Sequence, residues 1–186
     1  MHTDQEIEVR FLEVDPTEIK QKLIKLEATD LGEQTIHEII FYDHARSWGK
    51  YKFVRLRKTK DGSILTWKHQ HTDSADGTIE VETKVEDFDA MKRILEELGL
   101  EAFRTQEKHR HTFTLGKVTF DLDQWPLIPP YLEIEGPSEA SLREAATSLG
   151  LSWEDACFQA AGGVIKNIYG IDVISMQLLL LPSKNN

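Results

Sequence analysis

Residues 6–12 of the chain are EIEVRFL, an alternation of charged and apolar side chains that ends in two apolar residues. Side chains two apart on a β-strand point to the same side, so this stretch predicts a strand with one charged and one apolar face. Two later stretches carry the same pair of glutamates: IEVETKV at residues 79–85 and YLEIE at residues 131–135. Together they predict an antiparallel sheet with one wet and one dry face.

The rest of the chain alternates between strand and helix patterns, which predicts an α+β fold. Asp15 and Ser138 are typical N-cap residues, and Asp61-Gly62 is a hairpin signal. The predicted strands are Glu6–Leu12, His37–Tyr42, Tyr51–Lys58, Ile64–His69, Ile79–Val85, Lys108–Leu115, Val118–Leu122 and Tyr131–Glu135. The predicted helices start at Pro16, at Phe88, after Ser138 and at Trp153, the last running to Tyr169 with a break at Gly162-Gly163.

Length and composition narrow the class of protein. The 186 residues suit one domain over residues 1–182, with a C-terminal helical segment at about 152–181 and a polar tail at Ser183–Asn186. The net charge of −10 argues against a nucleic-acid partner, which needs a basic surface. The longest apolar run, Leu178–Leu181, is too short for a membrane span and suits packing on the body or a homodimer contact. A single cysteine, Cys157, and an N-terminus without a signal-peptide pattern lead us to expect a cytoplasmic protein.

The charged faces of the predicted strands form one constellation. A solvated outer face with cross-strand ion pairs is the simpler interpretation. Two features favour an enclosed lumen instead: the helices must take the apolar face, and the charges are grouped by sign. Grouped carboxylates suit Mg²⁺ or Mn²⁺, and grouped bases suit phosphate, so the pattern predicts a site for a metal-bound polyphosphate. The acids are Glu6, Glu8, Glu80, Glu82, Asp121, Asp123, Glu133 and Glu135, and the bases are Arg10, Arg55, Arg57, Lys68, Lys108 and Arg110.

The order of these motifs resembles that of the CYTH superfamily, also called triphosphate tunnel metalloenzymes. The opening motif resembles the family's ExExK signature, with Arg10 where the family usually has Lys. The motifs that carry the resemblance are Glu6-Ile7-Glu8-Val9-Arg10, Arg55-Leu56-Arg57, Thr66-Trp67-Lys68, Glu80-Val81-Glu82, Glu107-Lys108-His109-Arg110, Leu122-Asp123 and Glu133-Ile134-Glu135.

The resemblance implies an eight-stranded antiparallel β-barrel, a triphosphate tunnel, with helices packed on the outside. It implies a divalent metal, Mg²⁺ or Mn²⁺, held by Glu6, Glu8, Asp123, Glu133 and Glu135. It also implies a triphosphate held by Arg10, Arg55, Arg57, Lys68, Lys108 and Arg110, with Glu80, Glu82 and Lys108 taking part in catalysis. A C-terminal helix around Ile165–Tyr169 is expected at one mouth of the tunnel.

Three functions remain open at this point. Hydrolysis of tripolyphosphate, ATP or thiamine triphosphate needs the fewest features and is our leading hypothesis. Cyclisation of ATP to cyclic AMP and pyrophosphate, as in class IV adenylate cyclases, uses the same charges and additionally needs a nucleoside pocket. A non-catalytic polyphosphate-binding module is the third, although it would not need carboxylates in the lumen.

Overall fold

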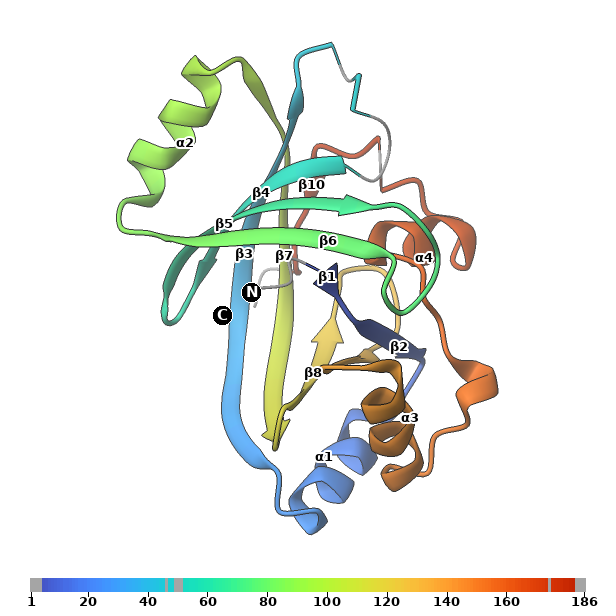
Figure 1. Cartoon of the computed structure of the whole chain (residues 1–186). Helices are drawn as coiled ribbons and strands as arrows, with labels where there is room; N and C mark the ends of the chain where they lie inside the picture. Colours follow the sequence, from blue (N-terminus) through green and yellow to red (C-terminus); the bar gives the residue numbers. More distant parts are fainter. Residues whose placement is uncertain (1–4, 46, 49–51, 174, 183–186) are drawn as a thin grey trace.

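The structure is a computed structural model that describes residues 5–45, 47–48, 52–173 and 175–182 (Figure 1). The predicted tail Ser183–Asn186 and the first residue of the predicted strand Tyr51–Lys58 lie outside these ranges. The strands are β1 (Gln5–Glu6), β2 (Glu8–Leu12), β3 (Thr29–Asp43), β4 (Lys52–Thr59), β5 (Gly62–Gln70), β6 (Thr78–Val85), β7 (Leu100–Leu115), β8 (Val118–Gln124), β9 (Tyr131–Glu135) and β10 (Leu178–Leu179). The helices are α1 (Pro16–Lys25), α2 (Phe88–Glu97), α3 (Glu139–Ser148), the short 3₁₀ helix η1 (Trp153–Asp155) and α4 (Ala161–Asn167).

The sheet curls because its two end strands are consecutive on the chain. The strand order is β1-β6-β5-β4-β3-β7-β8-β9-β2, and only Ile7 separates β1 from β2. The predicted strand Glu6–Leu12 is therefore split between two neighbours: β1 pairs with β6, and β2 pairs with β9. Hydrogen bonds do not close the ring, but the single chain through Ile7 bridges its two edges. With β1 and β2 counted as one strand, the predicted α+β fold with an eight-stranded antiparallel barrel is confirmed; the short β10 pairs parallel to β7.

Two strands are much longer than the alternation predicted. β3 and β7 pair along nearly their whole lengths, from Thr29 opposite Thr114 to Asp43 opposite Leu100. The alternation is hard to recognise in the first half of β3 because Gly32, with φ +87°, lies at a shift of register. The extra length of this pair forms one wall of the barrel (Figure 1).

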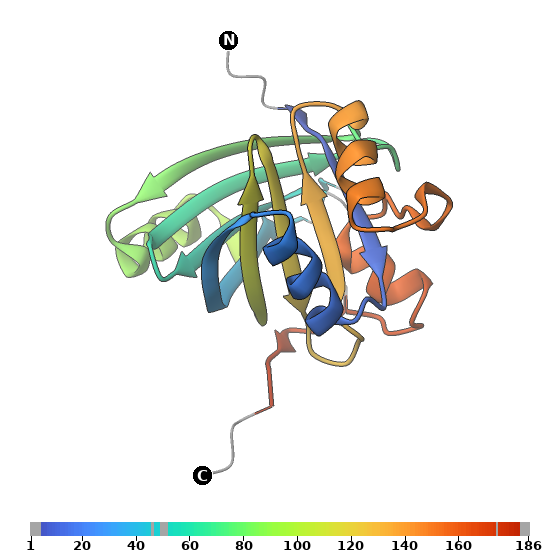
Figure 2. The ribbon, with the colours of Figure 1, turned by 90° about the horizontal axis from the view of Figure 1, so that it is seen from below.

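Three helices, α1, α2 and α3, cover the outer, apolar face of the barrel, as the charge argument required, whereas residues of α4 line the cavity inside it. α1 and α3 pack over β2, β8 and β9 in the largest hydrophobic cluster (Figure 2). α2 packs separately against β4 and β7. The buried core of the largest cluster includes Val9, Phe11, Leu23, Phe113, Phe120, Leu132, Ile134 and Leu142. Because this face is filled, the charged face of each strand is left to line the interior.

The predicted helix Trp153–Tyr169 is wrong in extent. Helical structure covers only η1 and α4, and Gly162 and Gly163 lie inside α4 rather than at a break. The chain between these helices is extended because Cys157 exchanges two backbone hydrogen bonds of 2.9 Å with Arg10 on β2. Among the described residues, no helix is both long enough and apolar enough to span a membrane.

Candidate active site

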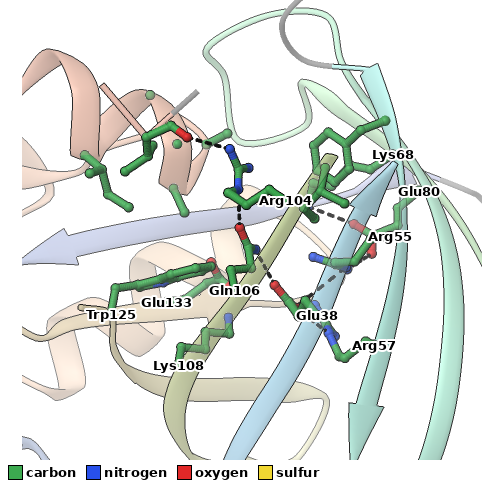
Figure 3. Close-up of a pocket in the computed structure, with 18 of the residues that line it drawn as sticks. Glu38, Arg55, Arg57, Lys68, Glu80, Arg104, Gln106, Lys108, Trp125 and Glu133 are labelled. Atoms are coloured by element: carbon green, nitrogen blue, oxygen red, sulfur yellow. Dashed lines mark hydrogen bonds and ion pairs between the residues drawn. The ribbon is translucent and has the colours of Figure 1, made fainter. Parts of the chain in front are cut away.

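The barrel encloses a cavity of about 740 Å³ lined mainly by the charged faces of its strands (Figure 3). Of the thirteen predicted site residues, eleven line this cavity. The other two, Glu8 and Asp123, lie behind its wall with exposed fractions of 6% and 0%. The eleven are Glu6, Arg10, Arg55, Arg57, Lys68, Glu80, Glu82, Lys108, Arg110, Glu133 and Glu135.

Asp123 holds Lys108 and Arg110, two of the bases that β7 contributes to the cavity lining. Its carboxylate accepts hydrogen bonds from Lys108 Nζ at 2.7 Å and from Arg110 Nε and Nη2 at 2.6 Å each. Burial and the neighbouring charge of Arg110 lower the pKa of Lys108. Lys108 Nζ also lies 5.1 Å from the centre of the Trp125 ring. Both oxygens of Asp123 are thus engaged by bases, which places it away from a metal position.

Lys68 lies among three carboxylates at the acidic side of the cavity. Its Nζ is 2.7 Å from Glu6 Oε2, 2.8 Å from Glu80 Oε2 and 3.7 Å from Glu8 Oε1. Burial, together with the charges of Glu8 and Glu80, raises the pKa of Glu6 to about 9. One ammonium therefore does not offset the negative charge collected here.

Arg10 joins the two acidic strands β2 and β9. Its Nη2 lies 2.6 Å from Glu133 Oε2 and 2.8 Å from Glu8 Oε2, and its Nη1 donates to the carbonyl of Gln159 at 2.9 Å. Burial alone would raise the pKa of Glu133, but Arg10 and Arg110 hold it well below the usual range. Glu133 is thus an ionised acid paired with two arginines.

Glu135 differs from these acids because, among the residues that the structure describes, no base pairs with it. Burial, followed by the charges of Glu133 and Glu8, raises the pKa of Glu135 to about 7. A carboxylate in this setting gains from a cation that neutralises it.

A Glu135→Gln change is expected to stabilise the metal-free protein above neutral pH. The pKa of Glu135 rises from 4.5 to about 7 on folding, so stability falls as pH rises from 4.5 to 7 and the penalty is complete above 7. The variant should therefore unfold with a larger free energy than the wild type at pH 8 and with nearly the same free energy at pH 4.5. Denaturant unfolding at both pH values tests this, with Glu86→Gln on the exposed surface as control. An equal difference at both pH values would contradict it.

The acids fit a divalent cation in their chemistry but do not form a finished cage. Carboxylate oxygens are the ligands that Mg²⁺ and Mn²⁺ prefer, and the raised pKa values of Glu6 and Glu135 mark uncompensated negative charge on one side of the cavity. Within the described ranges, no three acidic, histidine or cysteine side chains converge as a ready-made metal site. Of the five predicted ligands, Asp123 and Glu133 each have two bases within 3.0 Å. Glu6 and Glu8 each have one base that close, and Glu135 has none among the described residues, which leaves these three as the better candidates.

Sequence analysis missed three buried polar residues in the same cavity: Glu38, Arg104 and Gln106. Glu38 Oε1 lies 2.8 Å from Arg57 Nε. Burial alone would raise the pKa of Glu38, but Arg57 and Arg55 hold it well below the usual range. Glu38 could have been found from strand register. It is directly opposite Arg57 on the neighbouring strand, and a prediction that β3 pairs with β4 would have placed the two together.

The sequence profile of the CYTH domain matches residues 4–156. The chain belongs to the CYTH family. The matched residues include β1 to β9, whereas α4 and β10 lie beyond them. A comparison with curated proteins finds no match.

Solved structures from several organisms share this CYTH fold. A Pyrococcus horikoshii protein is 26% identical, with a TM-score of 0.71 over 83% of this chain and 96% of that one. A candidate adenylate cyclase from Vibrio parahaemolyticus is 19% identical, with a TM-score of 0.72 over 90% and 98%. A candidate adenylyl cyclase from Hippeastrum, described as having a dominant triphosphatase activity, is 13% identical, with a TM-score of 0.62 over 97% and 100%. At below 25% identity, the last two show the fold alone.

Proposed function

We propose that this CYTH protein hydrolyses triphosphates with the help of a divalent metal ion. The observation that carries the proposal is the division of one cavity into a basic wall and an acidic wall. The basic wall has Arg55, Arg57, Lys108 and Arg110. The acidic wall has Glu6 and Glu135, with the buried Glu8 behind it, and Lys68 lies within 4 Å of Glu6 and Glu8. A triphosphate with a bound metal presents the complementary charges to both.

The arginines that line the cavity have donors left for a phosphate. The Nε–H groups of Arg10 and Arg55 are buried and have no hydrogen-bond partner in the part of the chain that the structure describes. Among the described residues, Arg57 uses only its Nε, on Glu38, so its two Nη groups remain for a ligand. Arginine matches phosphate oxygens in geometry and charge, and such charge-assisted bonds are among the stronger hydrogen bonds. We assign phosphate binding to Arg10, Arg55, Arg57, Lys68, Lys108 and Arg110.

On the acidic side, Glu6, Glu8 and Glu135 would hold Mg²⁺ or Mn²⁺, with Glu133 nearby on the same strand as Glu135. When bound, such an ion supplies charge neutralisation and Lewis acidity at the phosphates. Glu82 is the better candidate to orient an attacking water because its side chain is 43% exposed and lies 3.7 Å from Arg55. Glu80 is held more tightly, by Arg55 at 2.6 Å and Lys68 at 2.8 Å.

Lys108 is assigned to stabilise or protonate the leaving phosphate, because its lowered pKa makes it a better proton donor than an ordinary lysine. Asp123 is assigned to orient Lys108 and Arg110 rather than to bind the metal. Each role is thus assigned from the hydrogen bonds and ion pairs that the side chain already makes.

The test is to incubate the protein with Mg²⁺ or Mn²⁺ and, separately, with tripolyphosphate, ATP or thiamine triphosphate, and to identify the products. Orthophosphate release that a chelator abolishes supports the proposal. Tight binding without turnover of any of the three would instead favour a binding module.

A class IV adenylate cyclase is the second candidate, and the apolar part of the cavity lining favours it. Besides its charged side chains, the cavity is lined by apolar ones, which suit a nucleoside better than a bare polyphosphate chain. Cyclic AMP and pyrophosphate from ATP, without orthophosphate from tripolyphosphate, would replace the hydrolase proposal with this one. The apolar lining residues are Ile40, Phe53, Trp125, Ile165, Val173 and Leu179.

An Arg57→Ala change is expected to weaken tripolyphosphate binding by about 1.5–3 kcal/mol, the usual worth of a hydrogen bond to a charged group. This corresponds to roughly a 10- to 150-fold rise in Kd, measurable by calorimetry without metal. Arg93→Ala, on the exposed side of α2, is the matched control and should bind as the wild type does. An unchanged Kd for Arg57→Ala would remove Arg57 from the site.

A further inference from the structure

A chain of buried hydrogen bonds crosses the cavity wall between β3 and β7 (Figure 3). Arg104 Nε donates to Gln106 Oε1 at 2.7 Å, and Gln106 Nε2 donates to Glu38 Oε2 at 2.5 Å. The other oxygen of Glu38 accepts from Arg57 Nε at 2.8 Å. All three linking residues, Arg104, Gln106 and Glu38, are at least nine-tenths buried, with exposed fractions of 9%, 6% and 2%.

Gln106 is well suited to the middle position. An arginine can only donate and a carboxylate can only accept, so the group between them must accept on one side and donate on the other. The side-chain amide does both, and the charges on either side fix which way it faces. A methionine at this position would fill the space and carry no hydrogen bond to either neighbour.

One end of this series of hydrogen bonds lies on the C-terminal segment, defined here as residues 168–173 and 175–182. Arg104 Nη1 donates to the carbonyl of Val173 at 2.7 Å. Val173 and Leu179 of this segment line the cavity and are almost fully buried. The segment also pairs with β7, where the Thr105 amide donates to the Gln177 carbonyl at 2.9 Å. It lies outside the residues that match the CYTH profile, so this contact belongs to the chain's own C-terminal extension of the barrel.

The other end of this series of hydrogen bonds is Arg57, to which we have assigned phosphate binding. Its Nε is fixed by Glu38, and its side chain lines the cavity. The position of Arg57 and the docking of the C-terminal segment therefore depend on the same three side chains.

We propose that Arg104, Gln106 and Glu38 form a positioning relay that couples docking of the C-terminal segment over the cavity to presentation of Arg57 to the triphosphate. This inference rests on the proposed function and adds residues that the reaction needs without their touching the reacting atoms. Coupling between two sites is reciprocal. A triphosphate that engages Arg57 must therefore tighten the segment, and loosening the segment must weaken triphosphate binding.

The amide of Thr105 reports segment docking because its hydrogen bond to Gln177 breaks when the segment opens. Hydrogen exchange follows such local openings. Exchange at this amide is measured without metal, with and without saturating tripolyphosphate, and the Kd for tripolyphosphate is measured by calorimetry. The variants are Gln106→Met, which interrupts the relay, and Arg104→Lys, which keeps the charge but lacks the fork that binds Gln106 and Val173 together.

Gln70→Met is the matched control. Gln70 is as buried as Gln106 and donates to the Phe158 carbonyl, but it does not contact the relay. In the wild type and in this control, tripolyphosphate should slow exchange of the Thr105 amide by about 5-fold or more, the lower range of ordinary coupling between sites. In Gln106→Met and Arg104→Lys the slowing should disappear, and the Kd should rise by a similar factor.

The outcomes separate the relay from the function it serves. If the wild type binds tripolyphosphate but Thr105 does not respond, or if the response persists in either relay variant, the relay is wrong and the proposed function stands. If Gln106→Met does not fold, Arg104→Lys decides alone. If the wild type does not bind tripolyphosphate, ATP or thiamine triphosphate, both proposals fail.

Discussion

A Glu8→Gln protein is expected to fold as the wild type does and to lose metal-dependent triphosphate cleavage by at least about 100-fold. Metal ions contribute several kcal/mol to such reactions, and each 1.36 kcal/mol is a factor of ten in rate. Glu8 accepts from Arg10 at 2.8 Å, and an amide oxygen can still accept that bond. The charge of Glu8 also raises the pKa of Glu6 and Glu135, so its removal relieves repulsion between buried carboxylates.

Three measurements are needed on Glu8→Gln: unfolding free energy without metal, affinity for Mn²⁺, and the rate of phosphate release. Stability should be kept while Mn²⁺ affinity and rate fall together. Glu86→Gln makes the same charge change on the exposed surface and should alter none of the three. Full activity in Glu8→Gln would exclude Glu8 from the metal site.

The inward side chains of this protein could be predicted from sequence because the strand repeat is strict. Once the helices must cover the apolar face, the charged residues of each strand fall on the other face without further information. The pairs Arg55 with Arg57 and Lys108 with Arg110 were found in this way, and all four line the cavity. Alternation alone does not distinguish an open sheet from a closed barrel. The barrel was predicted from the order of the motifs, through the resemblance to the CYTH superfamily.

The sequence could not show which acids are already engaged. Asp123 and Glu135 look alike on their strands, yet one is bound by two bases and the other has none among the described residues. The difference arises from register, since Arg110 is opposite Asp123, whereas Glu135 is opposite Thr119 on β8 and Glu8 on β2. Such pairings join residues that are far apart in the sequence, so a local pattern of side chains cannot predict them.

The relay was missed for a related reason. Glu38 lies in a stretch of mostly apolar residues, and Arg104 and Gln106 lie in the part of β7 that precedes the predicted strand. Similarly, the extended chain at Cys157 exists because Arg10, 147 positions earlier, supplies its hydrogen bonds. Helical periodicity around Trp153 could not anticipate that partner.

An Asp123→Ala change is expected to lower the free energy of unfolding by about 3–5 kcal/mol, the usual loss when one partner of a buried ion pair is removed. Asp123 is fully buried, and without it Lys108 and Arg110 face each other with less compensation. Burial, and after it the charge of Arg110, already lowers the pKa of Lys108. For a chain of this size the loss corresponds to a fall in Tm of roughly 6–20 °C.

Asp121→Ala is the matched control, because Asp121 is also buried and lies 2.5 Å from Arg110 Nη1. Arg110 keeps Asp123 and Glu133 in that variant, so its loss of stability should be smaller. Thermal and denaturant unfolding without metal decide between the two roles for Asp123. A metal ligand held among like charges would leave the metal-free protein as stable as before, whereas a carboxylate that holds two buried bases cannot be removed without that loss.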